Sequence, residues 1–273
     1  MKRILVIGAG RSSSTMIKYF LNQSQKENWL IRVGDMQLSF AQEKVGNHVN
    51  GEAFKFNALN AEERRKEISN SDIVISMLPA RFHLEVVRDC IDLKKDVITP
   101  SYVTDEMKAL NEQIIDAGII AMNEMGLDPG IDHMSAMKIL DEIEEKGGVV
   151  SGFESFTGGL IAPESDNNPW NYKFTWNPRN VVLAGQGGAA KFIQEGQYKY
   201  IAYNNLFRRT EIIEIEGFGK FEGYANRDSL RYRSIYGLEN IPTIYRGTLR
   251  KIGFCRAWNI FVKLGLTDDS YVI

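Results

Sequence analysis

Short apolar runs alternate with stretches of helical periodicity, about every dozen residues, through the first half of the chain. The first segment, residues 2–7, ends in a continuous apolar run, which is typical of a strand buried on both faces. This alternation predicts βαβ units, a parallel sheet and right-handed crossovers. We expect strands at residues 2–7, 29–34, 52–56, 72–78, 96–99 and 119–123, and helices at 13–25, 39–45, 83–93 and 104–117, with a further helix after Asn60; Asn60 and Thr104 are the expected N-caps.

The pattern changes after Gly130. A helix is expected at residues 132–146, with Asp132 as its N-cap and the glycine pair 147–148 at its end. Period-two alternation at residues 211–216 favours a more antiparallel sheet in this part of the chain. The strands expected here are 149–156, 191–203, 209–215 and 220–224, and a helical stretch is expected near 255–264.

Length and composition fit a two-domain globular protein. The chain has 273 residues, of which 44% are hydrophobic and 25% charged. We predict an α/β protein with a Rossmann-like doubly wound parallel sheet at residues 1–128. A mixed α/β substrate domain is expected at residues 129–273.

The net charge and the cysteine content indicate which classes of partner and which cellular compartment to expect. A net charge of −2 gives no global positive field that would attract nucleic acid. Two lone cysteines and three scattered histidines argue against a zinc site or a disulfide framework, so no metal is expected. The first apolar run stops at Gly8, too short for a signal peptide, and no run is long enough for a membrane span. We expect a cytoplasmic protein with no membrane partner.

The turn after the first strand carries a dinucleotide-binding signature. Gly8, Gly10 and Ser13 match the GxGxxG pattern, except that serine replaces the third glycine. The first glycine allows a tight turn, and the second lets the backbone approach a pyrophosphate at the helix N-terminus. Arg11 and Ser12 lie in the same turn and are expected cofactor contacts.

The second strand ends in an acid that predicts the choice of cofactor. Asp35 follows Gly10 by 25 residues, close to the spacing of the carboxylate that accepts the ribose 2′-hydroxyl. This carboxylate would repel a 2′-phosphate, so we expect NAD, with NADP as the alternative because Arg11 could reach a phosphate. Further cofactor contacts are expected from Asn57, which could equally be a turn former, and from Leu78 and Pro79 after the fourth strand.

A second turn leaves the sixth strand at residues 123–133. Pro129 and Gly130 make it rigid and hold Asp128 at the carboxyl edge of the sheet, where the nicotinamide is expected. A turn-forming aspartate is the alternative. Cofactor contacts are expected from Leu127, Gly130 and Ile131.

Several segments, in order along nearly the whole chain, resemble the glutamate-forming saccharopine dehydrogenase family. The string GGLIAPESDNNPW is far more specific than a glycine turn. The matching segments are GAGRSS at 8–13, Ser101-Tyr102, GLDPGIDH at 126–133, GGLIAPESDNNPW at 158–170, YKFTWNPR at 172–179, NRD at 226–228 and RGTLR at 246–250.

The resemblance implies a reaction that interconverts saccharopine with glutamate and 2-aminoadipate semialdehyde, with hydride passing to NAD or NADP. It also implies a Rossmann domain, a mixed α/β substrate domain and a helical domain inserted into the latter. Matching positions imply substrate contacts at Ser101, Tyr102, Asp128, Arg227, Thr248, Leu249 and Arg250.

Charge distribution agrees with a substrate that carries three carboxylates. Residues 207–256 hold ten Lys/Arg against six Asp/Glu, whereas the remainder holds 23 against 29. Arg227 and Arg250 are the expected carboxylate clamps, with surface salt bridges as the alternative. A base must take the amine proton and later assist water; Asp128 is the candidate and Glu124 the reserve, with Tyr102 expected to orient the substrate.

Two departures from the family pattern bear on activity. Thr157 stands where some relatives have cysteine, which argues against an essential nucleophile there. Members of the family extend well beyond the position of Ile273, so we expect this chain to be truncated relative to them. Two alternatives stay open: a related polyamine-pathway reductive-condensation dehydrogenase, and a truncated, non-catalytic nucleotide-binding protein. A homodimer is the expected assembly.

Overall fold

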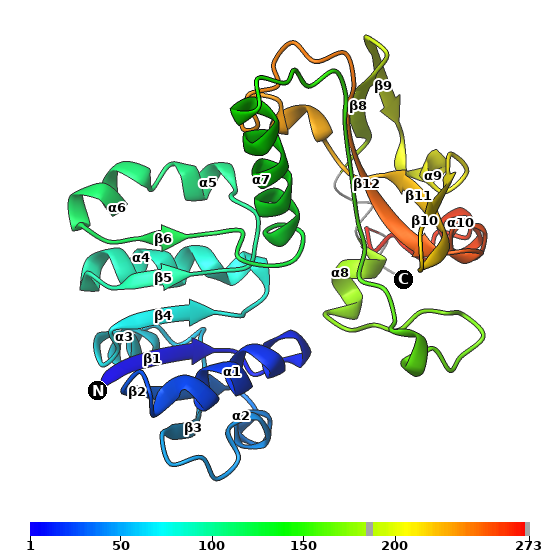
Figure 1. Ribbon diagram of the computed structural model, residues 1–273. Coiled ribbons are helices and arrows are strands. Elements are labelled where there is room, and N and C mark those ends of the chain that lie inside the picture. Colours follow the sequence, from blue (N-terminus) through cyan, green and yellow to red (C-terminus); the bar gives the residue numbers. More distant parts are fainter. Residues whose placement is uncertain (184–187, 271–273) are drawn as a thin grey trace. The chain divides into compact units, whose positions relative to one another are not determined.

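The computed structural model describes residues 1–183 and 188–270 (Figure 1). The chain divides into two compact units, Met1–Ile131 and Asp132–Ile273. Each unit has its own hydrophobic clusters, so each is described by itself.

A six-stranded parallel sheet forms the centre of the first unit. Its strand order is β3-β2-β1-β4-β5-β6, and every neighbouring pair is parallel. The order reverses between β1 and β4, which places a crevice for ligands at the carboxyl ends of these strands. The strands are β1 (Lys2–Ile7), β2 (Trp29–Asp35), β3 (Gly51–Lys55), β4 (Ile73–Ser76), β5 (Asp96–Ile98) and β6 (Ala121–Met122).

Helices cover both faces of this sheet, as Figure 1 shows. Ile17 of α1 packs in one cluster with Val6 of β1, and Val86 of α4 packs in another cluster with Leu5, which points to the opposite face. The doubly wound fold expected from the sequence is therefore confirmed. The helices are α1 (Ser14–Ser24), α2 (Leu38–Val45), α3 (Ala61–Ser69), α4 (His83–Leu93), α5 (Asp105–Lys108) and α6 (Asn111–Ala117), with short 3-10 turns η1 (Arg11–Ser13) and η2 (Ala80–Phe82).

Both N-caps expected in the first unit are present, but one expected helix is divided in two. Asn60 accepts a hydrogen bond from Glu63 N–H, and Thr104 accepts one from Met107 N–H. The single helix expected at 104–117 is instead two helices, α5 and α6. The turn between them places both Met107 and Leu110 in the core.

A second six-stranded sheet forms the second unit. The order is β10-β11-β12-β8-β9, and β7 pairs in parallel with β12. The strands are β7 (Phe153–Thr157), β8 (Ala190–Gln194), β9 (Gln197–Ile201), β10 (Glu211–Ile215), β11 (Gly219–Ala225) and β12 (Ile244–Lys251).

Two features of this sheet differ from the sequence expectation. The strand predicted at 191–203 is a hairpin, since Glu195 and Gly196 both have positive φ, at 50° and 75°, as tight hairpin turns require. The central strand β12 was not expected at all, because its sequence IYRGTLRK interrupts the apolar pattern with two arginines and a glycine.

The helices of the second unit include a further correction. Helix α7 (Ile131–Glu145) begins before Asp132, so Asp132 lies inside its first turn and is not the N-cap. Its carboxylate Oδ2 instead accepts a hydrogen bond from Arg246 Nη2 at 2.6 Å. The remaining helices are α8 (Pro178–Val182), α9 (Tyr203–Leu206) and α10 (Phe254–Lys263), with the 3-10 turns η3 (Pro163–Ser165) and η5 (Ser229–Tyr232).

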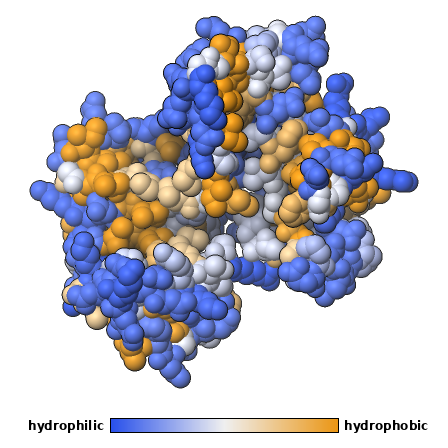
Figure 2. Space-filling view, viewed as in Figure 1, coloured by the Kyte–Doolittle hydropathy of each residue, from blue (hydrophilic) through white to orange (hydrophobic). Residues whose placement is uncertain are grey.

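Both cysteines are buried, whereas some apolar side chains are exposed on the surface. Cys90 is buried in the core of the first unit and Cys255 in that of the second, and both are free thiols. Exposed apolar side chains gather on the first unit over α6 and β6 (Figure 2), where Ile115, Ile120 and Met122 lie. Within the described residues, every helix falls short of the length and hydropathy that a bilayer span requires.

Candidate active site

The glycine turn after β1 leaves open space for a dinucleotide. Gly8 has φ +102°, and a Cβ there would lie 3.1 Å from the Met77 carbonyl oxygen. A Cβ on Gly10 would meet nothing within 4 Å, so a phosphate can approach its backbone. Ser13, in place of the third glycine, is buried and its Oγ donates to the Gly10 carbonyl at 2.8 Å. The substituted position therefore braces the turn, and the residues present fit a dinucleotide.

Asp35, at the end of β2, is bonded to this same turn. Its Oδ2 accepts from Ala9 N–H at 2.8 Å, and its Oδ1 accepts from Gln37 N–H at 2.9 Å. The carboxylate thus joins the glycine turn to the start of α2. Each oxygen keeps a second lone pair, which a ribose hydroxyl could use.

Other expected cofactor residues lie around the carboxyl ends of the strands. Leu78 and Pro79 follow β4, and Arg11 and Ser12 are exposed in η1. Asn57 Oδ1 accepts from Leu59 N–H at 3.0 Å, so this side chain forms an Asx turn, which was the alternative interpretation.

The turn after β6 is closed by its own backbone. The Asp128–Pro129 peptide bond is cis. Gly126 N–H donates to the Pro129 carbonyl at 2.9 Å, and Ile131 N–H donates to the Gly126 carbonyl at 3.0 Å. This ring of hydrogen bonds leaves Leu127 and Ile131 exposed and Asp128 half-buried.

Two of the expected catalytic residues are in direct contact. The Tyr102 hydroxyl donates to Asp128 Oδ1 at 2.6 Å, although 26 residues separate them. Glu124, the reserve base, uses Oε1 to accept from Val103 N–H at 3.0 Å and so holds the loop that carries Tyr102. Asp128 is therefore the acid bonded to Tyr102, whereas Glu124 supports the loop that carries Tyr102.

Sequence reasoning missed a buried histidine next to this pair. His83, at the start of α4, is 2% exposed and lies between two serines. Its Nδ1 is 2.9 Å from Ser76 Oγ, and its Nε2 is 2.8 Å from Ser101 Oγ. Burial lowers the pKa of His83 to about 4, so the ring is neutral at physiological pH. The only sequence signal was a histidine at the start of the helix expected at residues 83–93.

The expected substrate residues of the second unit lie along β12 and after β11. Thr248 is in register with Thr157 of β7 and with Tyr224 of β11. A Cβ on Gly158 would lie 2.3 Å from the Leu249 carbonyl oxygen, so the first residue of the GGLIAPESDNNPW string lies directly against the backbone of β12. Arg227 follows β11, is exposed and has φ +48°.

Arg250 lies against aromatic rings. Its guanidinium carbon is 5.2 Å from the Phe254 ring centroid and 5.6 Å from that of Tyr172. Its buried Nε has no hydrogen-bond partner among the described residues. These two rings, with Trp258 and Phe261, also line an apolar cavity of about 490 Å³.

A second residue that sequence reasoning missed, Arg246, is the most deeply buried arginine of this group. Arg246 is 4% exposed, pairs with Asp132, and places its guanidinium carbon 4.3 Å from the Tyr232 ring centroid. RGTLR was recognised as a matching segment, but no role in the site was expected of its first residue. The pair joins α7 to β12 within the second unit.

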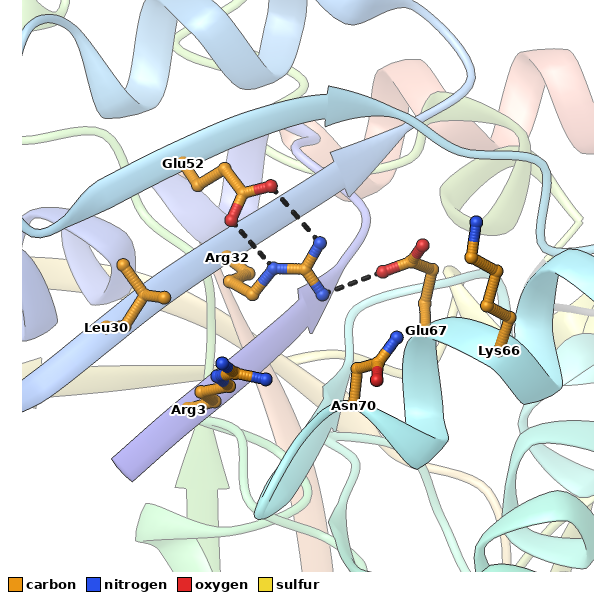
Figure 3. Close-up of a pocket in the computed structure, with 7 residues that line it drawn as sticks. All are labelled: Arg3, Leu30, Arg32, Glu52, Lys66, Glu67 and Asn70. Carbon is orange, nitrogen blue, oxygen red and sulfur yellow. Dashed lines mark hydrogen bonds and ion pairs between the residues drawn. The ribbon is translucent and has the colours of Figure 1, made fainter. Parts of the chain in front are cut away.

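A polar pocket lies elsewhere, near the amino-terminal ends of β1 and β2 (Figure 3). Arg32 is held between two acids, with Nε 2.8 Å from Glu52 and Nη1 2.7 Å from Glu67. The hydrogen bond from Arg32 lowers the pKa of Glu52. This site of about 410 Å³ is at the edge of the sheet opposite the glycine turn, and both of its acids are already paired with Arg32.

Residues 1–183 and 188–270 contain no group of three or more His, Cys, Asp or Glu side chains placed to hold a metal ion.

The strand order, the glycine turn and the acid at the end of β2 define an α/β protein of the dinucleotide-binding class. Residues 4–122 match the saccharopine dehydrogenase NADP binding domain, and residues 126–272 match the saccharopine dehydrogenase C-terminal domain. The chain therefore belongs to the saccharopine dehydrogenase family, as the resemblance of its motifs predicted.

Individual relatives agree over nearly the whole chain. It is 36% identical to a saccharopine dehydrogenase [NADP(+), L-glutamate-forming] of Schizosaccharomyces pombe, over 99% of this chain and 59% of that protein. It is 38% identical to an alpha-aminoadipic semialdehyde synthase of Arabidopsis thaliana, over 98% of this chain and 27% of that protein. The structure of an apo saccharopine dehydrogenase (L-Glu forming) from Saccharomyces cerevisiae matches with a TM-score of 0.87 and 33% identity, over 99% of this chain and 60% of that one.

The chain matches only part of the length of each of these relatives. The match covers about three fifths of the length of these two fungal relatives and about a quarter of that of the Arabidopsis protein. Dinucleotide binding is the property common to the matched domain and to the glycine turn, and the description of that domain carries NADP. The expected preference for NAD over NADP rests on Asp35 and not on this match.

Proposed function

We propose that this chain carries the nucleotide- and substrate-binding parts of an NAD(P)-dependent dehydrogenase that acts on the C–N bond of saccharopine. The reaction interconverts saccharopine, oxidised dinucleotide and water with glutamate, 2-aminoadipate semialdehyde, reduced dinucleotide and a proton. Family membership over both units supports this proposal, as do the printed names of the relatives.

The contact between Tyr102 and Asp128 carries the proposal. A carboxylate at the carboxyl edge of the sheet that carries the cofactor turn is suited to take the proton from the secondary amine and later to assist water. Tyr102 holds that carboxylate and orients the substrate. When bound, the dinucleotide would accept the hydride from the carbon that becomes the aldehyde of 2-aminoadipate semialdehyde.

The dinucleotide contacts form the first part of the site. We assign the pyrophosphate to Gly8, Gly10, Arg11, Ser12 and Ser13, because this turn joins the carboxyl end of β1 to the first helix and leaves open space at Gly10. The remaining contacts assigned to the cofactor are Asn57, Leu78, Pro79, Leu127, Gly130 and Ile131.

The substrate carboxylates need fixed cations and hydroxyl donors. Arg227 and Arg250 are assigned to them, because arginine binds carboxylates with two parallel hydrogen bonds. The position of Arg250 against two rings supports this role, since the rings restrict its side chain without neutralising its charge. Ser101, Thr248 and Leu249 complete the assigned substrate contacts.

NAD is the proposed cofactor, although the matched domain is described as NADP binding. Asp35 places negative charge at the end of β2, where a 2′-phosphate would lie. The residues that follow it, Met36, Gln37 and Leu38, include no cation that could bind such a phosphate.

The setting of the enzyme also belongs to the proposal. Two buried free thiols support a reducing compartment, and we assign the protein to the cytoplasm. A homodimer is the proposed assembly, and the substrate is the proposed small-molecule partner.

An absorbance assay for NADH formation from saccharopine tests the function. We expect turnover by the wild type and a loss of about 10²- to 10⁴-fold in kcat for Asp128→Asn, because general base catalysis is worth about that much. The Tyr102→Phe variant should lose less, and NAD affinity measured by calorimetry should stay unchanged in both.

Three other outcomes would point elsewhere. Turnover of a diamine with an aldehyde, but not of saccharopine, would favour the polyamine-pathway reaction. NAD binding without turnover of either substrate would favour a non-catalytic nucleotide-binding protein. Full activity in Asp128→Asn would remove Asp128 from the chemistry.

A further inference from the structure

A buried chain of hydrogen bonds ends at one of the proposed substrate residues. It runs from Ser76 Oγ to His83 Nδ1, and from His83 Nε2 to Ser101 Oγ, with distances of 2.9 and 2.8 Å. Ser76 ends β4, His83 begins α4, and Ser101 follows β5. The histidine thus connects three elements beneath the carboxyl edge of the sheet.

Hydrogen-bond capacity fixes the tautomer of this ring. Ser76 is 0% exposed, and among the described residues His83 Nδ1 is the hydrogen-bond partner of its hydroxyl. The single hydroxyl hydrogen of Ser76 must therefore go to Nδ1, because a buried donor is rarely left unsatisfied. Nδ1 is then the acceptor, and the ring proton lies on Nε2.

The tautomer in turn fixes the role of Ser101. Nε2–H donates to Ser101 Oγ, so the serine oxygen is an acceptor toward the histidine. Its backbone is anchored independently: Ser101 N–H donates to Thr99 Oγ1 at 3.1 Å, and its carbonyl accepts from Glu124 N–H at 3.0 Å. The Ser101 hydroxyl hydrogen has no acceptor among the described residues.

We propose that His83 is a positioning residue which, held by Ser76 in its Nε2–H tautomer, makes the Ser101 hydroxyl a hydrogen-bond donor for a carboxylate of the substrate. This inference rests on the proposed function, which assigns Ser101 to the substrate. Three carboxylates offer only acceptors when ionised, so a serine that presents its hydrogen is suited to them and one that presents a lone pair is not.

The tautomer can be read directly in the wild-type protein, whether or not it turns over saccharopine. Long-range ¹⁵N–¹H correlation spectra at pH 7 should show His83 Nε2 as the protonated nitrogen and Nδ1 as the acceptor. The His83→Gln variant identifies the signal by its loss. An Nδ1–H ring would overturn the proposal.

A matched pair of variants tests the positioning role. In a Ser76→Ala background, which leaves no orphaned serine, His83→Gln places an amide nitrogen near the site of Nε2, whereas His83→Asn reaches only the site of Nδ1. We expect KM for saccharopine to rise about tenfold in the Asn variant and less than about threefold in the Gln variant. KM for NAD should be the same in both.

The outcomes separate this inference from the proposed function. Equal KM values for saccharopine in the Gln and Asn variants would contradict the positioning role while leaving the activity in place. A wild type that shows the Nε2–H ring but no turnover would instead contradict the proposed function. If the double variants do not fold, the tautomer in the wild type decides.

Discussion

Asp35 meets two demands with one carboxylate. It accepts hydrogen bonds from Ala9 and Gln37 N–H groups, and it places a negative charge beside the cofactor turn. Removing the side chain would therefore disturb the turn as well as the charge. A test of cofactor choice has to separate the two effects.

Asp35→Asn makes that separation. Asparagine keeps the shape and an oxygen that can accept from Ala9, but it removes the charge that repels a 2′-phosphate. We expect the preference for NAD over NADP, taken from the ratio of the two dissociation constants in calorimetry, to fall by about tenfold. Glu43→Gln removes an exposed charge from α2 of the same unit and should leave the ratio unchanged. An equal shift in both variants would mean that only net charge matters.

His83 links protonation to stability. Burial lowers its pKa to about 4, whereas the unfolded chain keeps an ordinary value of 6.5. As pH falls from 7 to 5, the unfolded state binds a proton that the folded state does not. The stability is fully present above pH 6.5 and is lost as pH falls toward 4. Urea unfolding should show a loss of about 2 kcal/mol between pH 7 and 5 in the wild type that is missing from His83→Gln. The same pH effect in both proteins would contradict this.

Element by element, local patterns predicted the first unit well and the second less well. Buried parallel strands leave continuous apolar runs, so β1 to β6 were found within a few residues. Strand β12 escaped because Arg246 breaks its pattern, and that arginine is buried only because Asp132, 114 residues away, pairs with it. His83 was missed because its two serine partners, 7 and 18 residues away, belong to other segments of the chain, and no local pattern brings them together.

The candidate site was predictable where a motif carried it. The glycine turn and the turn around Asp128 follow from local sequence. The contact between Tyr102 and Asp128 depends instead on how two loops meet at the sheet edge, which no local pattern reveals.

The close passage of Gly158 over β12 gives a prediction at this scale. Gly158→Ala would place a Cβ 2.3 Å from the Leu249 carbonyl oxygen, so the backbone must move, whereas a Cβ at Gly159 meets nothing within 4 Å. We expect Gly158→Ala to lower the free energy of unfolding by about 2 to 3 kcal/mol, and Gly159→Ala to change it by less than about 1 kcal/mol. Denaturant unfolding compares them. Similar free energies of unfolding for the two variants would show that the backbone of β12 can shift at little cost.

For the molecule as a whole, two units with separate cores predict an unequal response to cofactor. A ligand at 100 times its dissociation constant stabilises the state that binds it by about 2.7 kcal/mol. Amide hydrogen exchange with saturating NAD should slow in β1, β2 and β4 more than in β11 and β12. Equal protection of both sheets would mean that the units open together.

The buried thiols offer an independent view of such opening. Burial raises the pKa of Cys90 to about 12, and it also raises that of Cys255, so neither sulfur reacts while its core is closed. Each unit holds one of them. The alkylation rate of each residue, followed by mass spectrometry, therefore reports how often its own unit exposes its interior, without any engineered label.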